Sequence, residues 1–143
     1  MMPSELEEGN SLAIDFRKLE SVVANGQALL PTVVQEVESG EVLLVGYVNK
    51  VALEATFKTK KATFWSSSRN ELWVKGKSSG NFLIVDEIRI NCEQNSLLYR
   101  VRMVGEGACH TQDAEGGYRF GCFYRKIHKN QFLTHLESPQ ETG

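Results

Sequence analysis

The sequence predicts an α+β fold with a mostly antiparallel β-sheet and few short helices. Runs rich in β-branched and aromatic residues outnumber segments with helical periodicity, and the strands do not alternate with helices along the chain. The 143 residues, 41% of them hydrophobic, suit one compact domain with a single core. We therefore predict one domain over residues 1–143, with residues 1–11 and 129–143 peripheral or mobile.

Six strand-like runs are separated by turn residues. They cover residues 29–37, 42–48, 62–68, 72–76, 82–90 and 96–104. The first two runs flank the turn 38–41, so we expect them to form a hairpin. Pro31 has no N–H to donate to a neighbouring strand. Either the first run therefore lies at an edge of the sheet, or the proline is one of the first residues of its strand.

Helical periodicity is weaker and more local. A short helix that ends at Gly26 is predicted from apolar residues near helical spacing, namely Phe16, Leu19, Val22 and Val23. Asn49 is suited to cap a second helix over the apolar residues that follow it. The polar residues 1–11 predict a frayed segment, the Gly-rich stretch 105–121 predicts a loop, and the tail 128–143 predicts one short helical turn.

The composition excludes several classes of protein. The net charge of −2 and a pI near 5.9 give no overall attraction to nucleic acid or to acidic membranes. No apolar run is long enough to cross a bilayer, and the acidic N-terminal stretch lacks the basic-then-apolar order of a secretory signal. We therefore expect a cytoplasmic protein with no nucleic-acid partner and no membrane partner.

The three cysteines form a candidate metal site. An odd number excludes a complete set of disulfides within one chain. Cys92, Cys109 and Cys122 each lie at a loop or strand end beside polar or glycine residues, and a small buried hydrophobe is the alternative role. Three thiolates would occupy three corners of a zinc tetrahedron and leave the fourth for water, as in catalytic zinc sites. His110 directly follows Cys109 and would lower the pKa of its thiol.

Several motifs along residues 30–127 resemble those of phosphoribosyl-AMP cyclohydrolase and occur in the same order. They are LLPTVVQ (29–35), GEVL (40–43), YVN (47–49), ATFWSSSRNELWVKGKSSGN (62–81), Cys92 followed by SLL (96–98), ACHT (108–111) and CFYR (122–125). The resemblance implies a homodimer with zinc sites at the subunit interface, whose ligands Cys92, Cys109 and Cys122 are drawn from both chains. The stretch 111–121 is longer than in the family, and a bulged loop can absorb it at little entropic cost.

The resemblance also implies a reaction in histidine biosynthesis. The substrate would be an adenine nucleotide with a second phosphoribosyl group on N1, which makes C6 of the ring electrophilic. Zinc would acidify water and so supply hydroxide to attack C6. The N1–C6 bond then breaks, and the exocyclic nitrogen stays in the product as a carboxamide. His110 is the candidate catalytic residue that moves a proton, and a hydrogen bond that orients a metal ligand is its alternative role.

The two phosphates of this substrate require sites that bind anions. Hydroxyl groups, backbone N–H groups and two cations are available for this in two stretches of the matched region. The candidate substrate-binding residues are Trp65, Ser66, Ser68, Arg69, Lys75, Ser78 and Ser79. Family members usually have an arginine where this chain has Ser67, so we expect one phosphate contact to be weaker here.

The segment around the first cysteine departs from the family pattern. That pattern is Asp-Cys-Asp-x-Asp, with aspartates that hold magnesium, and here the segment reads NCEQN (91–95). An extended backbone would still put Asn91, Glu93 and Asn95 on one face, but three carboxylates become one, and magnesium prefers anionic oxygen. We predict a magnesium site that is weak, completed by substrate or lost. In the alternative interpretation, Asn91 and Asn95 form turn hydrogen bonds.

Two alternative functions remain open. The first is a non-catalytic, zinc-stabilised dimer that binds a nucleotide and derives from the enzyme. The altered segment 91–95 favours it, while the three thiols, His110 and the WSSSR stretch (65–69) argue against it. The second is a small antiparallel module that binds RNA, which the sheet content allows but the acidic charge and the missing basic and aromatic face do not.

Overall fold

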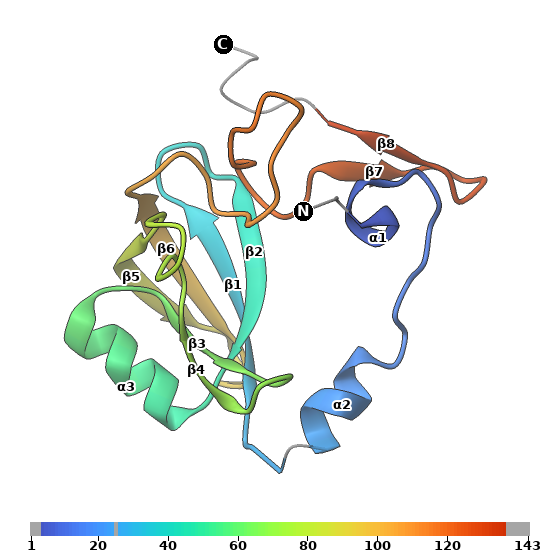
Figure 1. The fold of residues 1–143 in the computed structure, drawn as a ribbon. Coiled ribbons are helices and arrows are strands. Elements are labelled where there is room, and N and C mark those ends of the chain that lie inside the picture. The colour runs from blue at the N-terminus through green and yellow to red at the C-terminus, as the bar shows by residue number, and fades with distance from the viewer. Residues whose placement is uncertain (1–3, 25, 137–143) are drawn as a thin grey trace.

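The computed structural model describes residues 4–24 and 26–136, and a four-stranded sheet forms its centre (Figure 1). In spatial order its strands are β2 (Val42–Val48), β1 (Leu30–Glu36), β6 (Leu97–Met103) and β5 (Leu83–Ile90). β1 pairs with β2 and β6 pairs with β5 in antiparallel register, whereas the central pair of β1 and β6 is parallel. The α+β class, the mostly antiparallel pairing and the first hairpin are thus confirmed, and the parallel pair of β1 and β6 makes the central sheet mixed.

Pro31 is the second residue of β1, an inner strand of the sheet. Pairing of β1 with β6 begins only at Thr32, which lies opposite Leu97. The missing N–H of the proline therefore removes no bond from that ladder, and the second of the two predicted placements is the correct one.

A helix and a second hairpin pack against this sheet. Helix α3 (Lys50–Thr59) begins after Asn49, whose side-chain oxygen accepts the N–H of Ala52 at 2.9 Å, as the predicted cap requires. The hairpin consists of β3 (Thr63–Ser66) and β4 (Glu71–Val74). Phe64 of β3 is fully buried, and a Cβ on Gly46 would come within 2.5 Å of its ring. The side chains that complete this core include Val34, Leu43, Leu83, Tyr99 and Val101.

Both ends of the described chain form elements that the sequence pattern did not predict in full. The helices are α1 (Glu5–Glu8) and the predicted α2 (Lys18–Ala24), and β7 (Arg125–Ile127) pairs with β8 (Leu133–His135). Residues 5–8 of the segment predicted to be frayed form a helix, and residues 133–135 of the tail form a strand where a helical turn was predicted. Residues 1–3 and 137–143 lie outside the described part. Leu133 is buried and its N–H donates to Asn10 O at 2.9 Å, so a contact between the two segments stabilises both.

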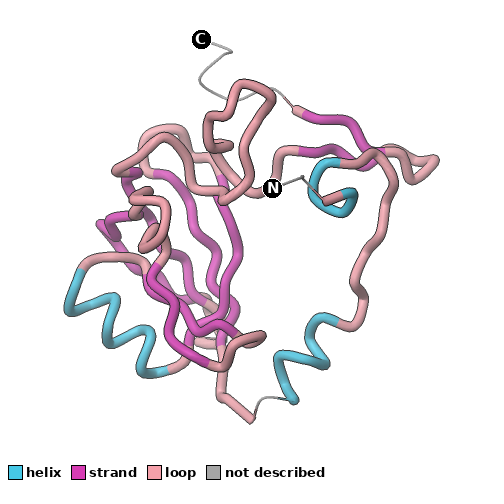
Figure 2. The backbone as a smooth tube through the Cα atoms, in the orientation of Figure 1, coloured by secondary structure: helices cyan, strands magenta, loops and turns pink. Residues whose placement is uncertain are grey.

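The sheet has two ends that carry different loops (Figure 2). At the first end Leu83 pairs with Met103, and the long loop 104–124 follows. At the second end Ile90 pairs with Leu97 across the turn 91–96. β6 has seven residues, so it spans about 20 Å between these ends. Across residues 4–24 and 26–136, no helix is long and apolar enough to cross a membrane.

Candidate metal centre

Cys109 and Cys122 lie together at the end of the sheet where β6 ends. The N–H of Cys122 donates to Leu43 O of β2 at 2.6 Å, and the N–H of Cys109 donates to Arg119 O at 3.1 Å. Gly121 permits the first contact, because a Cβ there would meet the Leu43 backbone at 3.1 Å. The two thiols interact with each other. The structure thus brings together two of the three predicted zinc ligands.

The stretch between these two cysteines folds back on itself. Near its base the N–H of Ala108 donates to Phe120 O at 2.9 Å. At its tip the Asp113 carboxylate accepts the N–H groups of Glu115 and Gly117, at 2.9 and 3.1 Å. The predicted bulged loop therefore absorbs the additional residues without separating the cysteines.

The thiol pair holds its protons unequally. Interaction with the Cys122 thiol lowers the pKa of Cys109 to about 5, against the effect of burial and with help from Thr111. The hydroxyl of Thr111 lies 3.0 Å from Cys109 Sγ. The same interaction raises the pKa of Cys122. At neutral pH the pair therefore carries one negative charge, in the thiolate form that binds metal ions.

Lys75 supplies a positive charge beside this pair. It directly follows β4, is only 7% exposed, and interacts electrostatically with both thiols. Its ammonium nitrogen lies 5.6 Å from the centroid of the Trp73 ring. Burial lowers the pKa of Lys75, and the two thiols oppose this shift. A lysine predicted to contact phosphate thus lies among the predicted metal ligands.

Cys92 lies in the turn 91–96, at the other end of the sheet, and is exposed. Asn91 Oδ1 accepts the N–H groups of Asn95 and Ser96 at 2.9 and 2.8 Å, and Asn91 Nδ2 donates to Asn95 Oδ1 at 2.7 Å. These are the turn hydrogen bonds of the alternative interpretation, and Glu93 is exposed beside them. Within residues 4–24 and 26–136, no three Cys, His, Asp or Glu side chains form a group able to hold a metal ion.

His110 is exposed beside the thiol pair and contacts the N-terminal segment. Its neighbours Cys109 and Thr111 are buried, whereas its own side chain is 75% exposed. Its Nε2 lies 2.6 Å from a carboxylate oxygen of Glu7 in α1. The sequence contains no local signal for this partner, because Glu7 belongs to a polar segment more than one hundred residues earlier.

The first group of predicted substrate-binding residues lies in the β3–β4 turn. Ser66 Oγ lies 3.3 Å from Ser68 Oγ and accepts the N–H of Arg69 at 3.3 Å. Trp65 Nε1 donates to the side chain of Asn70 at 3.2 Å. The turn is therefore closed by its own side chains, and Ser68 and Arg69 remain exposed.

The second group follows the opposite end of β4 and comprises Ser78, Ser79 and Lys75, which interacts with the thiol pair. Ser79 Oγ accepts the N–H of Asn81 at 3.1 Å. Asn81 is a further polar residue near these two serines, and the sequence did not single it out. Its side chain is buried, and its Oδ1 accepts the N–H of Glu106 at 3.3 Å. Its Nδ2 has no hydrogen-bond partner among the described residues. The SGN triplet of the matched motif was the only signal for it.

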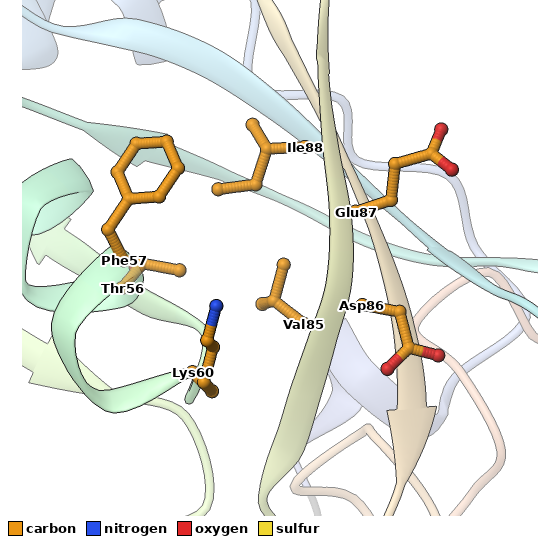
Figure 3. A pocket seen from close by; sticks show the side chains of 7 residues that line it. All are labelled: Thr56, Phe57, Lys60, Val85, Asp86, Glu87 and Ile88. Atoms are coloured by element: carbon orange, nitrogen blue, oxygen red, sulfur yellow. The ribbon is translucent and has the colours of Figure 1, made fainter.

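A small pocket lies elsewhere, between α3 and β5 (Figure 3). Its lining consists of Thr56, Phe57, Lys60, Val85, Asp86, Glu87 and Ile88. In Figure 3 the carboxyl groups of Asp86 and Glu87 point away from Phe57, which leaves a mostly apolar hollow with one amine. None of the predicted site residues lines it, so this pocket is not the candidate site.

Comparison with known proteins assigns the chain to a family. The family model described as phosphoribosyl-AMP cyclohydrolase matches residues 44–124, which include all three cysteines. A phosphoribosyl-AMP cyclohydrolase of Desulfotalea psychrophila is 43% identical over 105 residues, or 73% of this chain and 78% of the relative. Those of Chlorobium phaeovibrioides and Clostridium botulinum are 42% and 47% identical, and the matches cover 85% and 80% of this chain and 84% and 91% of the relatives. The chain therefore belongs to the phosphoribosyl-AMP cyclohydrolase family of enzymes.

Proposed function

We propose that this chain opens the adenine ring of phosphoribosyl-AMP by zinc-dependent hydrolysis of the N1–C6 bond, as a cytoplasmic step of histidine biosynthesis. The observation that carries the proposal is the pair of Cys109 and Cys122, whose thiols interact with each other beside the buried Lys75. Thiolates are strong zinc ligands, and free thiols persist in a reducing cytoplasm. The donor set of the chain therefore fits zinc.

The position of Cys92 supports a homodimer. Thiolates that share one zinc ion lie about 2.3 Å from it, whereas Cys92 and the thiol pair lie at opposite ends of β6, a distance on the order of 20 Å. One chain therefore cannot supply all three ligands. A second copy would bring its exposed Cys92 to the pair, so that Cys109 and Cys122 come from one subunit and Cys92 from the other.

When bound there, zinc would supply hydroxide near neutral pH. Attack at C6 and cleavage of the N1–C6 bond require a proton to move from the attacking oxygen to N1. His110 would move it, and Glu7, 2.6 Å from the ring, would hold the imidazole. Lys75 would offset the negative charge of the thiolates, while Ser78, Ser79 and Arg69 would bind phosphate.

We infer that the segment 91–95 forms a magnesium site that is weak, completed by substrate or lost. The amide oxygens of Asn91 and Asn95 already accept turn hydrogen bonds, and Glu93 is its one carboxylate. Magnesium prefers several anionic oxygens. We therefore assign no step of the reaction to magnesium, and any binding would be weak or completed by the substrate phosphates.

The same segment is the observation that favours a second candidate, a zinc-stabilised dimer that binds a nucleotide without turnover. Hydrolysis of phosphoribosyl-AMP, followed by ultraviolet absorbance with and without a zinc chelator, separates the two functions. Turnover that the chelator abolishes would support the enzyme. Folded, zinc-loaded protein without turnover, even in added magnesium, would contradict it and favour nucleotide binding.

A further inference from the structure

The thiol pair is carried by the loop 104–124, whose first arm contains Cys109 and whose second arm contains Cys122. The N-terminal segment contacts both arms. We call residues 4–9 the N-terminal clasp. On the first arm, Glu7 lies 2.6 Å from His110, next to Cys109. On the second arm, the Glu8 carboxylate accepts two hydrogen bonds from the Arg119 guanidinium, at 2.7 and 2.8 Å.

Backbone oxygens of the clasp add two contacts to the second arm. The hydroxyl of Tyr124 donates to Glu7 O at 2.8 Å, and Arg125 Nη1 donates to Gly9 O at 3.0 Å. Tyr124 lies two residues after Cys122 in the sequence. The clasp thus contacts the chain segments on which the two thiols are carried. Figure 1 shows α1 beside β7, the strand that follows this loop.

The pair of Glu8 and Arg119 is the strongest of these contacts. Its two parallel hydrogen bonds join charged groups whose side chains are only 25% and 13% exposed. The Arg119 guanidinium also stacks 4.1 Å above the centre of the Tyr124 ring. The pKa of Glu8 is lowered, first by its hydrogen bonds with Arg119. Both partners are therefore held in one geometry, unlike most surface ion pairs.

Arg119 is joined directly to the thiol pair through its main chain. Its carbonyl oxygen accepts the N–H of Cys109 at 3.1 Å, and its N–H donates to Thr111 O at 3.1 Å. Thr111 in turn places its hydroxyl 3.0 Å from Cys109 Sγ. A shift of Arg119 would therefore move Cys109 relative to Cys122, which is held separately by Leu43.

We propose that Glu8 is a positioning residue, which acts through Arg119 to hold Cys109 beside Cys122 and so sets the affinity of the thiol pair for metal. The inference rests on the proposed zinc function. It adds to that function a requirement for residues 4–9, which lie outside the matched region 44–124.

The test compares Glu8→Gln with Glu5→Gln in the full chain. Both variants remove one negative charge from α1, but Glu5 is exposed and has no ion-pair partner within residues 4–24 and 26–136. Zinc affinity is measured by competition with a chromophoric chelator, and the metal geometry from the absorption bands of the cobalt-substituted protein. We expect Glu8→Gln to weaken zinc binding about 10- to 100-fold and to change the cobalt bands, with Glu5→Gln equal to wild type.

Exchanging the charges of Glu8 and Arg119 tests whether their ion pair, rather than a general disturbance of the structure, sets the zinc affinity. Glu8→Arg and Arg119→Glu should each weaken zinc binding, and the double variant should recover most of the affinity and the wild-type cobalt bands. Equal zinc affinity and equal cobalt bands in Glu8→Gln and Glu5→Gln would overturn the positioning role while leaving the zinc centre in place. Wild-type protein without thiolate-to-cobalt bands would instead overturn the zinc centre itself, and the inference with it.

Discussion

The thiols of Cys109 and Cys122 interact with each other across the base of a folded-back loop, with the ammonium group of Lys75 beside them. This interaction lowers the pKa of Cys109 and raises the pKa of Cys122, which favours a thiolate on Cys109. Cys92 lies apart from this pair, in a turn at the other end of the sheet.

Replacing the buried thiol should remove the metal and the activity together. In Cys109→Ser the hydroxyl is a far weaker zinc ligand than a thiolate, so we expect zinc content to fall from about one ion per chain to nearly none. Turnover of phosphoribosyl-AMP should be lost in parallel, while the far-ultraviolet circular dichroism spectrum stays unchanged. Turnover at the wild-type rate would show that Cys109 is not a ligand.

Mixed dimers should reveal which subunit supplies which ligand. We expect Cys92→Ser and Cys109→Ser to be inactive alone, but a heterodimer of the two contains one intact site, formed by Cys109 and Cys122 of one chain and Cys92 of the partner. Such heterodimers should show about half of the wild-type activity per dimer, as simple site counting requires.

The matched control for this experiment is the heterodimer of Cys109→Ser with Cys122→Ser. Both ligands come from the same subunit in our proposal, so neither site of this heterodimer is intact and activity should stay absent. Activity in the control, or none in the first heterodimer, would contradict the assignment of ligands to subunits.

The reactivity of Cys109 in zinc-free protein should follow its pKa. The folded-state pKa of Cys109, about 5, lies below its ordinary value of 9.0. The thiolate therefore contributes stability to the fold that is fully present above pH 9. This contribution is lost as the pH falls through about 5. We expect the alkylation rate of Cys109 by iodoacetamide, resolved by peptide mass spectrometry, to fall by half near pH 5. In Cys122→Ser the midpoint should move upward, and an unchanged midpoint would argue against the thiol interaction.

Lys75 should raise the affinity of the site for zinc without stabilising the zinc-free fold. Its burial penalises the charged ammonium group, so Lys75→Met should leave the zinc-free protein equally or more resistant to urea. Zinc affinity should fall about tenfold, because the thiolates lose a nearby cation. Lys75→Arg retains the charge and serves as the control in chelator competition. Equal zinc affinity in Lys75→Met and wild type would exclude this role.

The close approach of Gly46 to Phe64 should make the core intolerant of a methyl group. In Gly46→Ala the new Cβ would meet the aromatic ring at 2.5 Å, so we expect a loss of about 1–3 kcal/mol in the free energy of unfolding. Val45→Ala changes the exposed neighbouring position and should alter the free energy by less than about 1 kcal/mol. Urea denaturation of both variants measures the difference, and equal stability would argue against the packing at Phe64.

The sequence alone was sufficient for much of the local structure. Apolar, β-branched runs bounded by turn residues predicted β1 and β2 within one or two residues of their observed bounds, and Asn49 predicted the start of α3. These features depend on neighbours within a few positions, so a local pattern contains the information. The cysteines, His110 and the motif order similarly indicated the family to which the chain belongs.

Only the tertiary structure decided which of these residues meet. The parallel pairing of β1 with β6, the meeting of Cys109 with Cys122 and the separation of Cys92 depend on contacts between distant parts of the chain. The same is true of α1, whose Glu8 belongs to a polar stretch with no pattern of its own and acquires a role only where Arg119 comes to face it. The sequence by itself thus determined most of the central elements and the chemical groups. The packing of the chain determined their partners and the elements at its two ends, because partners far apart in sequence leave no local periodicity.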